Sequence, residues 1–433
     1  MPRSSDPAAS GRGAALLRDL GVVNGPDPDV NELLERVELV DHHTHSIVGG
    51  PVAAADYEFM LSESDRSSAA AAAGLDTQIG FAARRWIGPL LGLRPNDPED
   101  RFLGARLALT NEKAAARLLP AAGLERLIVD TGFRGDEILS AAGLGVLAKV
   151  PVSTVVRLEA IAERLALEGV PAAGFGSAVR DAVEAELAAG AVGLKSIIAY
   201  RAGLDVDPAR PRGAEVVDSA DRWLREVARD GRARLVDPVL LRLLLWTAVD
   251  TGRPLQVHTG FGDPDLDLDR ADPLLLTEFL RQTDGACPVL LLHCYPFHRN
   301  AGYLAQMFAH VYVDVGLAIN YVGAQAPVVL AESLELAPFR KVLFSSDAWG
   351  LPDLHLLGSW LFRRAMARAI GGWVAGGDWS RHDALHVIEL IAFENARRVY
   401  GLPARGSARR SGRDYRSRSS AAPAGTFSTA VDE

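Results

Sequence analysis

Five residues of metal-binding type stand where apolar runs of the sequence stop. The first run ends in DHHTH, in which His43 and His45 are two residues apart. In an extended strand, side chains at i and i+2 point to the same side about 6.5 Å apart, so two imidazoles can converge on one ion. Later apolar runs stop at His258, His293 and Asp347. The pattern predicts that five metal-competent side chains face one spot, provided that the runs are neighbouring strands.

Eight such apolar runs recur along the chain, and each is followed by a longer stretch with helical spacing. This alternation is typical of parallel strands joined by crossover helices. The runs are apolar almost throughout, as expected for barrel strands that are covered on both faces. We therefore predict an α/β fold, a (β/α)8 TIM-type barrel, in which all strand ends of one kind lie at one rim. The predicted strands are Val37–His43, Arg126–Thr131, Val152–Arg157, Val192–Ile197, Pro254–His258, Val289–His293, Val311–Val315 and Lys341–Ser346.

An open doubly wound sheet is the alternative, but no Gly-rich phosphate loop follows the first run, where that fold commonly has one. We predict an N-terminal extension over residues 1–36 and the barrel over 37–402. Residues 46–125 are too many for an ordinary connection and are rich in helix formers, which predicts a helical insertion shielding the barrel mouth. Residues 403–433 are rich in Arg and Ser and predict a disordered tail.

Composition narrows the partners of the protein. The net charge of -9 argues against a nucleic-acid partner. The two cysteines, Cys287 and Cys294, lie in or beside one apolar run, so a disulfide framework is not expected and a reducing cytoplasm fits. The most apolar helical run, Val239–Val249, is far shorter than a membrane span, and we predict neither export nor a membrane segment. A small-molecule substrate is expected, with a homodimer as the default assembly.

The sequence resembles the amidohydrolase superfamily and, within it, the amidohydrolase-related (amidohydrolase 2) branch. The resemblance is carried by LVDHHTH, GLKSIIAYRAGL, LQVHTGFGD, LLHCYPFHRNAGYLA, LFSSDAWGLPDLH and FENARRVYGL, which together span roughly residues 38–402. The sequence is also similar to the amidohydrolase-like domain that nodulin-like proteins carry fused to glutamine-synthetase-type domains.

The resemblance implies a role for each matching position. His43, His45 and His258 would bind a divalent metal as neutral imidazoles, and Asp347 would bind or approach it and accept a proton from water. Zn²⁺ is the expected metal, while Mn²⁺ or Fe²⁺ also suits such ligands. His293 would polarise the scissile carbonyl or stabilise the oxyanion, unless it binds a second metal.

Lys195 stands at the end of the fourth run, in a chain where only four of the 46 basic residues are lysine. In binuclear members of the superfamily a carboxylated lysine at this strand end bridges two metals, whereas in mononuclear members a lysine there can pair with a substrate carboxylate. We expect the second role, because Arg201 follows closely and adds a second cation. The other expected substrate contacts are Arg157, Glu159, His298 and Trp349.

These features predict a metal-dependent hydrolase that cleaves an amide-type C–N bond of a small carboxylate-bearing substrate, with Asp347 and His293 as catalytic residues. A γ-glutamyl amide is the specific expectation, and it follows from the resemblance to the fusion proteins. A decarboxylase or an isomerase on the same barrel is the first alternative, since the fold does not decide the reaction. A catalytically inactive binding module is the second.

Overall fold

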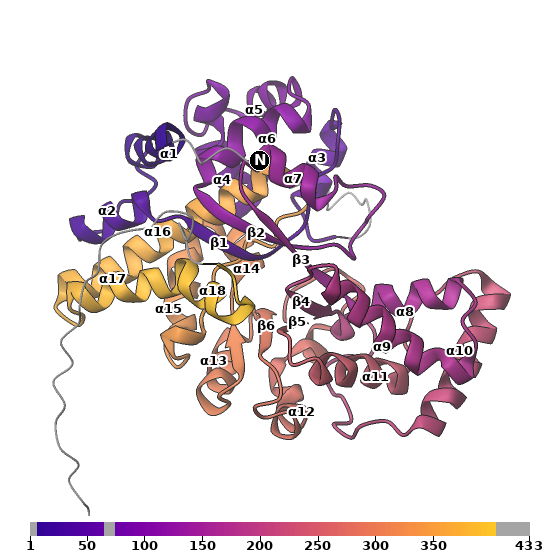
Figure 1. Cartoon of the computed structure of the whole chain (residues 1–433). Helices are drawn as coiled ribbons and strands as arrows, with labels where there is room; N and C mark the ends of the chain where they lie inside the picture. The colour runs from indigo at the N-terminus through magenta and orange to yellow at the C-terminus, as the bar shows by residue number, and fades with distance from the viewer. Residues whose placement is uncertain (1–6, 65–73, 404–433) are drawn as a thin grey trace, which may run out of the picture.

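The computed structural model describes residues 7–64 and 74–403, in which a curled parallel sheet is surrounded by helices (Figure 1). Seven strands follow one another across the sheet in chain order, as in a TIM-type barrel. Seven of the eight predicted strands are confirmed, with ends shifted by at most two residues. Their bounds are β1 Leu39–Thr44, β2 Leu124–Asp130, β3 Val152–Arg157, β4 Gly193–Ser196, β5 Leu255–Thr259, β6 Val289–His293 and β7 Val311–Val313.

The eighth predicted strand, Lys341–Ser346, is wrong as a regular strand. Its first residue ends a 3-10 helix, Phe339–Lys341, and the extended segment that follows makes single hydrogen bonds to both neighbours. Leu343 N donates to a carbonyl of β7 at 3.0 Å, and His42 N of β1 donates to the carbonyl of Phe344 at 3.1 Å. The segment therefore bridges β7 and β1 without a continuous ladder.

A side chain replaces part of that missing ladder. Asp41 Oδ1 accepts a hydrogen bond from Ser346 N at 2.9 Å, and Asp41 Oδ2 accepts one from Ser346 Oγ at 2.5 Å. Burial raises the pKa of the Asp41 carboxyl to about 7. An amide that is bound to a carboxylate cannot also join a strand ladder, because it has one N–H to donate. This explains why an apolar run fails to become a strand at its end.

Helices cover the outside of the sheet, and several belong to the regions expected to flank the barrel. Of the described residues, those before β1 form two helices, and those between β1 and β2 form four helices and two 3-10 turns, as expected for a helical insertion. The bounds of these helices are α1 Pro7–Asp19, α2 Pro28–Arg36, α3 Ala54–Met60, α4 Gln78–Trp86, α5 Glu99–Leu107 and α6 Asn111–Leu118. Domain limits at 36/37 and 402/403 stay predictions.

The remaining helices alternate with the strands or close the C-terminal side of the chain. The longest of them, α16, packs against α2, α6, α14 and α15, and most of its residues are buried. The bounds are α7 Ala141–Ala148, α8 Leu158–Leu167, α9 Ala172–Ala188, α10 Gly213–Asp230, α11 Pro238–Asp250, α12 Thr277–Gln282, α13 His298–Met307, α14 Gly316–Val322, α15 Ala326–Ser333, α16 Pro352–Gly376, α17 Arg381–Glu389 and α18 Asn395–Tyr400.

Two hydrophobic cores support the strands. The larger lies between the sheet and its helices. The smaller brings together side chains of several strands with two residues of α18; its buried members are Val40, Ile128, Val155, Leu290, Leu292, Leu343, Ala396 and Tyr400. Burial of apolar surface stabilises a fold by about 25 cal/mol per Å². The two cores therefore stabilise the strands whose ends carry the polar residues.

Arg363 of α16 holds the N-terminal ends of β1 and β2. Its Nη1 donates to the carbonyls of Leu34 at 2.6 Å and Val37 at 2.7 Å, and its Nη2 donates to that of Gly123 at 2.9 Å. Its Nε donates to Ser359 Oγ at 3.2 Å. Burial lowers the pKa of this guanidinium to about 10, so it stays charged at neutral pH. The clamp joins the helix before β1, the turn before β2 and α16 through one side chain.

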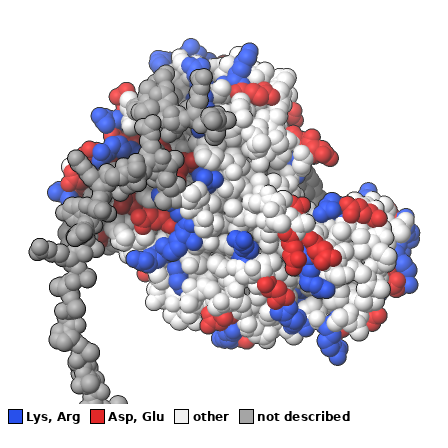
Figure 2. All heavy atoms as spheres, viewed as in Figure 1, with Lys and Arg blue, Asp and Glu red and all other residues white. Residues whose placement is uncertain are grey.

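The surface and the tail leave several expectations open. On the face shown in Figure 2, acidic and basic side chains lie interspersed. The absence of a nucleic-acid partner, the homodimer and the cytoplasmic location stay predictions. No helix in the described part of the chain is long and apolar enough to cross a membrane. Residues 404–433, nearly all of the predicted tail, lie outside the described residues.

Candidate functional site

The C-terminal ends of the strands surround a cavity of about 250 Å³. Most of the residues expected from the sequence line it, although they come from six separate parts of the chain. Those that do are His43, His45, Arg157, Lys195, Arg201, His258, His293, Asp347 and Trp349. The strand-end rule therefore brings these residues to one place.

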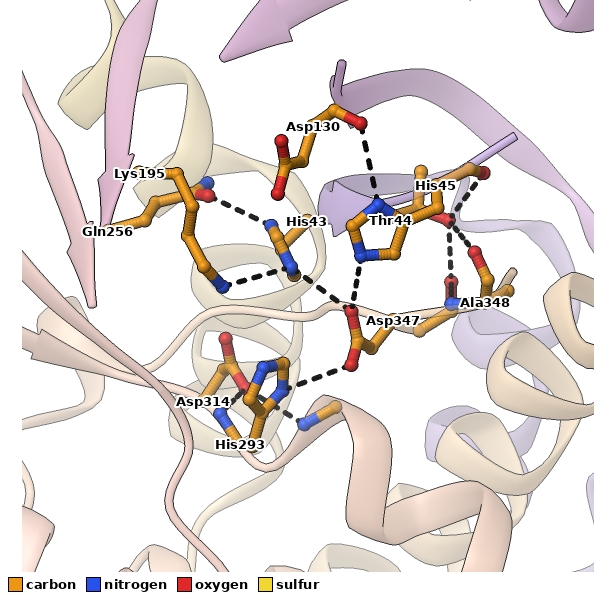
Figure 3. Close-up of polar contacts among 12 residues, drawn as sticks. His43, Thr44, His45, Asp130, Lys195, Gln256, His293, Asp314, Asp347 and Ala348 are labelled. Carbon is orange, nitrogen blue, oxygen red and sulfur yellow. Dashed lines mark hydrogen bonds and ion pairs between the residues drawn. The ribbon is translucent and has the colours of Figure 1, made fainter. Parts of the chain in front are cut away.

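Three of the expected ligands form a compact group. The ligand atoms of His43, His45 and Asp347 all lie within 4.8 Å of one another, and all three residues are buried. Asp347 Oδ1 is 3.0 Å from His43 Nε2 and 3.4 Å from His45 Nε2 (Figure 3). Both imidazoles thus point at the same carboxylate oxygen.

Hydrogen bonds to the other ring nitrogens determine the tautomers of both imidazoles. Gln256 Nε2 donates to a backbone carbonyl of β1 at 2.9 Å, so Gln256 Oε1, 2.8 Å from His43 Nδ1, must accept. His45 Nδ1 lies 3.4 Å from the carbonyl of Asp130, which can only accept. The protons are therefore on Nδ1, and the Nε2 lone pairs of His43 and His45 both face Asp347.

This arrangement fits a divalent metal. Acceptor atoms that face one another at such distances repel unless a cation lies among them. Within the described residues, Asp347 Oδ1 and His258 Nε2 are buried and have no hydrogen-bond partner. Imidazole and carboxylate ligands suit zinc, manganese and iron alike. Three of the four expected ligands therefore form a group that fits a divalent metal, without selecting the metal.

His258 and His293 lie beside the compact group. Their ring centroids are 4.5 Å apart, and the His293 ring is 5.5 Å from that of His43. The ligand atoms of His258 do not belong to the group of three. Burial is the main cause that lowers the pKa of His43 to about 3, that of His293 to about 4 and that of His258 well below its usual value. All three are therefore neutral at neutral pH, which is the form that binds metals.

Asp347 stays ionised in spite of its position. Burial by itself would raise the pKa of its carboxyl, but a proton on the neighbouring His293, His43 or His45 outweighs burial and lowers that pKa well below its usual range. Its backbone is left-handed, with φ of 50°. A non-glycine residue rarely adopts this conformation, which costs about 1–3 kcal/mol. The contacts of the site hold the residue there.

Asp314, after β7, holds the backbone that presents His293. His293 has φ of 68° and Cys294 has φ of 58°. Asp314 Oδ1 accepts from His293 N at 2.8 Å and from Gly316 N at 2.9 Å, and its Oδ2 lies 2.8 Å from His42 Nε2. Burial would raise the pKa of Asp314, but the hydrogen bond with His42 and nearby charges lower it to about 2. An ionised carboxylate thus fixes the turn at the end of β6.

Lys195 reaches both the ligand group and the cavity. Its Nζ lies 3.3 Å from His43 Nε2, and burial lowers the pKa of its ammonium group to about 8. In the sheet, Lys195 pairs with Arg157 on one side and with Gln256 on the other. Arg157 Nη2 in turn binds Asp130 Oδ2 at 2.6 Å. The amine of Lys195 therefore lies beside a metal ligand as well as in the cavity.

Two expected substrate contacts lie elsewhere. Glu159 Oε1 accepts from Ser196 Oγ at 2.7 Å and from Ile197 N at 3.0 Å, so it holds the end of β4 and does not line the cavity. It lies in the first turn of α8 and is buried. His298 Nε2 lies 2.8 Å from Glu332 Oε2, between α13 and α15, and also does not line the cavity.

Sequence reasoning missed several residues of the site. Asp130 ends β2 and Asp314 follows β7, so the strand-end rule that selected the ligands could have found them. Gln256 is two residues before His258 and so shares its side of β5. No comparable signal pointed to Glu63 or Tyr200, which line the cavity from a loop and a 3-10 turn.

Comparison with known proteins agrees with this fold. The parallel barrel and its His/His/Asp group are those of a metal-dependent hydrolase of the TIM-barrel class. The amidohydrolase family model matches residues 40–402. The chain therefore belongs to the amidohydrolase family.

One related sequence and two solved structures are similar to this chain. Protein fluG of Emericella nidulans is 34% identical over 221 residues, a match that covers 49% of this chain and 26% of that protein. A structure described as a metal-dependent hydrolase from Lactobacillus casei is 27% identical, with a TM-score of 0.77 over 87% of this chain and 98% of the other. A uronate isomerase from Thermotoga maritima shares the fold at 16% identity, with a TM-score of 0.56 over 87% of this chain and 98% of the other.

Proposed function

We propose that this protein is a metal-dependent hydrolase that cleaves an amide-type C–N bond of a small carboxylate-bearing substrate. One observation carries the proposal: the Nε2 lone pairs of His43 and His45 converge with Asp347 Oδ1 inside a cavity that also contains Lys195 and Arg201. A γ-glutamyl amide is the specific substrate we propose, on the strength of the sequence resemblance to the fusion proteins.

The residues divide the chemistry among them. A divalent metal held by His43, His45, His258 and Asp347 would lower the pKa of a water molecule toward about 7. The ionised carboxylate of Asp347 can accept the proton that the attacking water loses and pass it to the departing amine. His293, neutral and close to the group, can donate a hydrogen bond to the oxygen of the scissile carbonyl as it gains charge.

Cationic groups support a carboxylate-bearing substrate. Arg201 Nη2 binds Glu163 at 3.0 Å, while Arg201 Nε is buried and has no hydrogen-bond partner in the described chain. A buried N–H without a partner is costly, and a substrate carboxylate would satisfy it. Lys195 offers a second cation at the same rim, because its pKa of about 8 leaves the amine largely protonated at neutral pH.

The first test is metal content per chain, measured by elemental analysis on the purified protein. We expect about one zinc per chain, lost in His43→Ala and Asp347→Ala and retained in Lys195→Ala. His386→Ala, which removes an exposed imidazole of α17, is the matched control. Two metals, with one lost in Lys195→Ala, would make Lys195 a bridging ligand, and no metal would overturn the proposal.

The second test is a substrate panel for the metal-loaded protein. Release of amine from γ-glutamyl amides, absent in His43→Ala, would support the proposed reaction. Release of carbon dioxide from carboxylic acids, or interconversion of uronates without amine release, would instead support the decarboxylase or isomerase alternative. The shared fold with uronate isomerases gives the alternative a specific substrate class to test.

A further inference from the structure

One acidic residue of the cavity has no part in the reaction proposed above. Glu63 follows α3 in the insertion and lines the cavity together with the metal-binding residues. Its Oε2 accepts a hydrogen bond from Tyr321 Oη of α14 at 3.1 Å. Within residues 7–64 and 74–403, no lysine or arginine forms an ion pair with this carboxyl group. In the part of the chain that the structure describes, Glu63 is therefore an acid in the cavity without a cationic partner.

The surroundings of Glu63 disfavour a lone negative charge. Burial raises the pKa of its carboxyl to about 8, and the carboxylates of Asp347 and Asp263 contribute in the same direction. The hydrogen bond from Tyr321 favours the anion, and a cation that approached the carboxyl group would favour it further. The cavity therefore offers a position that a cationic ligand group would fill.

Three arginines of the cavity differ from Glu63, because each is paired with an acid. Arg157 binds Asp130, Arg201 binds Glu163, and Arg234 Nη2 lies 3.1 Å from Asp265 Oδ2. None of these pairs includes Glu63. Among the described residues, the cavity therefore contains both a buried arginine N–H without a hydrogen-bond partner, Arg201 Nε, and a carboxyl group without an ion-pair partner, that of Glu63.

Two phenols accompany the Glu63 carboxyl in this region. Tyr321 donates a hydrogen bond to it, and Tyr200 lines the same cavity. Tyr200 directly precedes Arg201 in the chain. Phenol rings attract cations as well as offering hydrogen bonds. The cavity therefore combines an aromatic ring with Glu63 and Arg201.

We propose that Glu63 binds the α-ammonium group of the substrate, while Arg201 and Lys195 bind its carboxylate, so that the cavity selects amides of α-amino acids. This inference rests on the proposed function and makes Glu63 a specificity-determining residue. An α-amino acid carries an ammonium and a carboxylate on one carbon, which matches one unpaired acid and one unpaired N–H donor in a single cavity. Simple dicarboxylic amides lack the first of these groups.

The first experiment compares two substrates that differ in the amino group alone, γ-glutamyl p-nitroanilide and glutaryl p-nitroanilide. We expect the wild-type protein to prefer the amino-bearing substrate by roughly tenfold or more in kcat/KM, the size expected for a charge-assisted contact. Glu63→Gln is expected to bring the ratio of the two kcat/KM values close to one. An unchanged ratio would overturn the inference.

Two further variants separate recognition from folding. Glu58→Gln makes the same change in the same segment, on a residue of α3 outside the cavity, and should leave the ratio unchanged. Tyr321→Phe removes the donor to Glu63 and should lower the ratio less than Glu63→Gln does. Equal loss of the ratio in Glu58→Gln would overturn a specific role for Glu63.

A binding experiment distinguishes this inference from the proposed reaction. Calorimetry on the zinc-loaded protein should show tighter binding of L-glutamate than of glutarate, with the difference removed by Glu63→Gln. If neither anilide is cleaved but this Glu63-dependent preference is present, the proposed reaction fails and the inference stands. Equal affinity for the two ligands, or affinity for neither, would overturn the inference even if both anilides are cleaved.

Discussion

Arg363 and the residues of the cavity lie near opposite ends of the barrel strands and differ in how fully their buried polar atoms are hydrogen-bonded. Near the N-terminal ends, Arg363 is buried and every one of its nitrogen atoms donates a hydrogen bond. Near the C-terminal ends, Asp347 Oδ1, His258 Nε2 and Arg201 Nε have no hydrogen-bond partner among the described residues. Satisfied polar groups stabilise the fold, whereas unsatisfied ones are costly and are retained where a ligand satisfies them. The comparison separates residues that hold the barrel from residues that serve its reaction.

The largest expected effect concerns a metal ligand at the C-terminal ends of the strands. His45→Ala should abolish tight zinc binding and lower kcat/KM on the order of 10³-fold or more, because the several kcal/mol that a metal contributes to the transition state are lost. The unfolding free energy of the metal-free protein should change little, since His45 Nε2 faces another acceptor. Elemental analysis and urea unfolding measure the two effects. Wild-type zinc content in His45→Ala would contradict the assignment.

The next largest effect concerns Arg363, near the N-terminal ends of the strands. Arg363→Met should lower the free energy of unfolding by about 3–5 kcal/mol, because several buried carbonyls lose their donor. Zinc content per folded chain should stay at the wild-type value. Arg368→Met, an exposed position on the same helix, is the control. If Arg363→Met lost zinc while keeping its stability, the assignment of Arg363 to fold stability and not to metal binding would be wrong.

Asp314 refines the comparison between the two ends of the strands. It lies near the C-terminal ends, but both of its carboxylate oxygens have hydrogen-bond partners. Its pKa of about 2 lies below the ordinary 3.8. A lowered folded pKa means that this stabilisation is present above about pH 4 and is lost as the pH falls toward 2, and the difference corresponds to about 2 kcal/mol. Urea unfolding between pH 5 and pH 2 should therefore show a shallower decline for Asp314→Asn than for the wild type. Parallel declines would show that Asp314 does not contribute in this way.

The smallest expected effect concerns Tyr400, whose hydroxyl group supports Gln256 behind the metal ligand His43. Tyr400 of α18 accepts a hydrogen bond from Gln256 Nε2 at 2.7 Å, and its hydroxyl lies 3.1 Å from His42 Nδ1. Tyr400→Phe should weaken zinc binding by up to roughly tenfold, as loss of outer support for a ligand does. Competition with a chelator measures this affinity, and Tyr303→Phe at an exposed position serves as control. Unchanged zinc affinity would show that Gln256 holds His43 without the help of Tyr400.

Much of the fold could be predicted from local patterns. Seven apolar runs became strands because both faces of each are covered, and this requirement is written into their composition. The eighth failed because Asp41, about 300 residues away in the chain, binds the amide of Ser346. Such a contact leaves no trace in the residues around position 346, so no local pattern could have indicated it.

The site divides in the same way. His43 and His45 were predicted because their spacing and their place at a strand end are both local properties. Glu159 and His298 were placed wrongly at the cavity, because a charged or polar residue near a strand end can point under the rim as readily as over it. Glu63 gave no signal at all, since its loop reaches the cavity through the path of the insertion.

The sequence by itself determined the class of protein, because the order HxH, His, His, Asp at the ends of apolar runs limits both the fold and the ligand chemistry. The tertiary structure decided which atoms face one another. Gln256 sets the tautomer of His43, and Tyr321 meets Glu63 across 258 positions of the chain. The physical reason is that strand and ligand patterns are local, whereas proton positions, burial and charge pairing depend on groups that only the folded chain brings together.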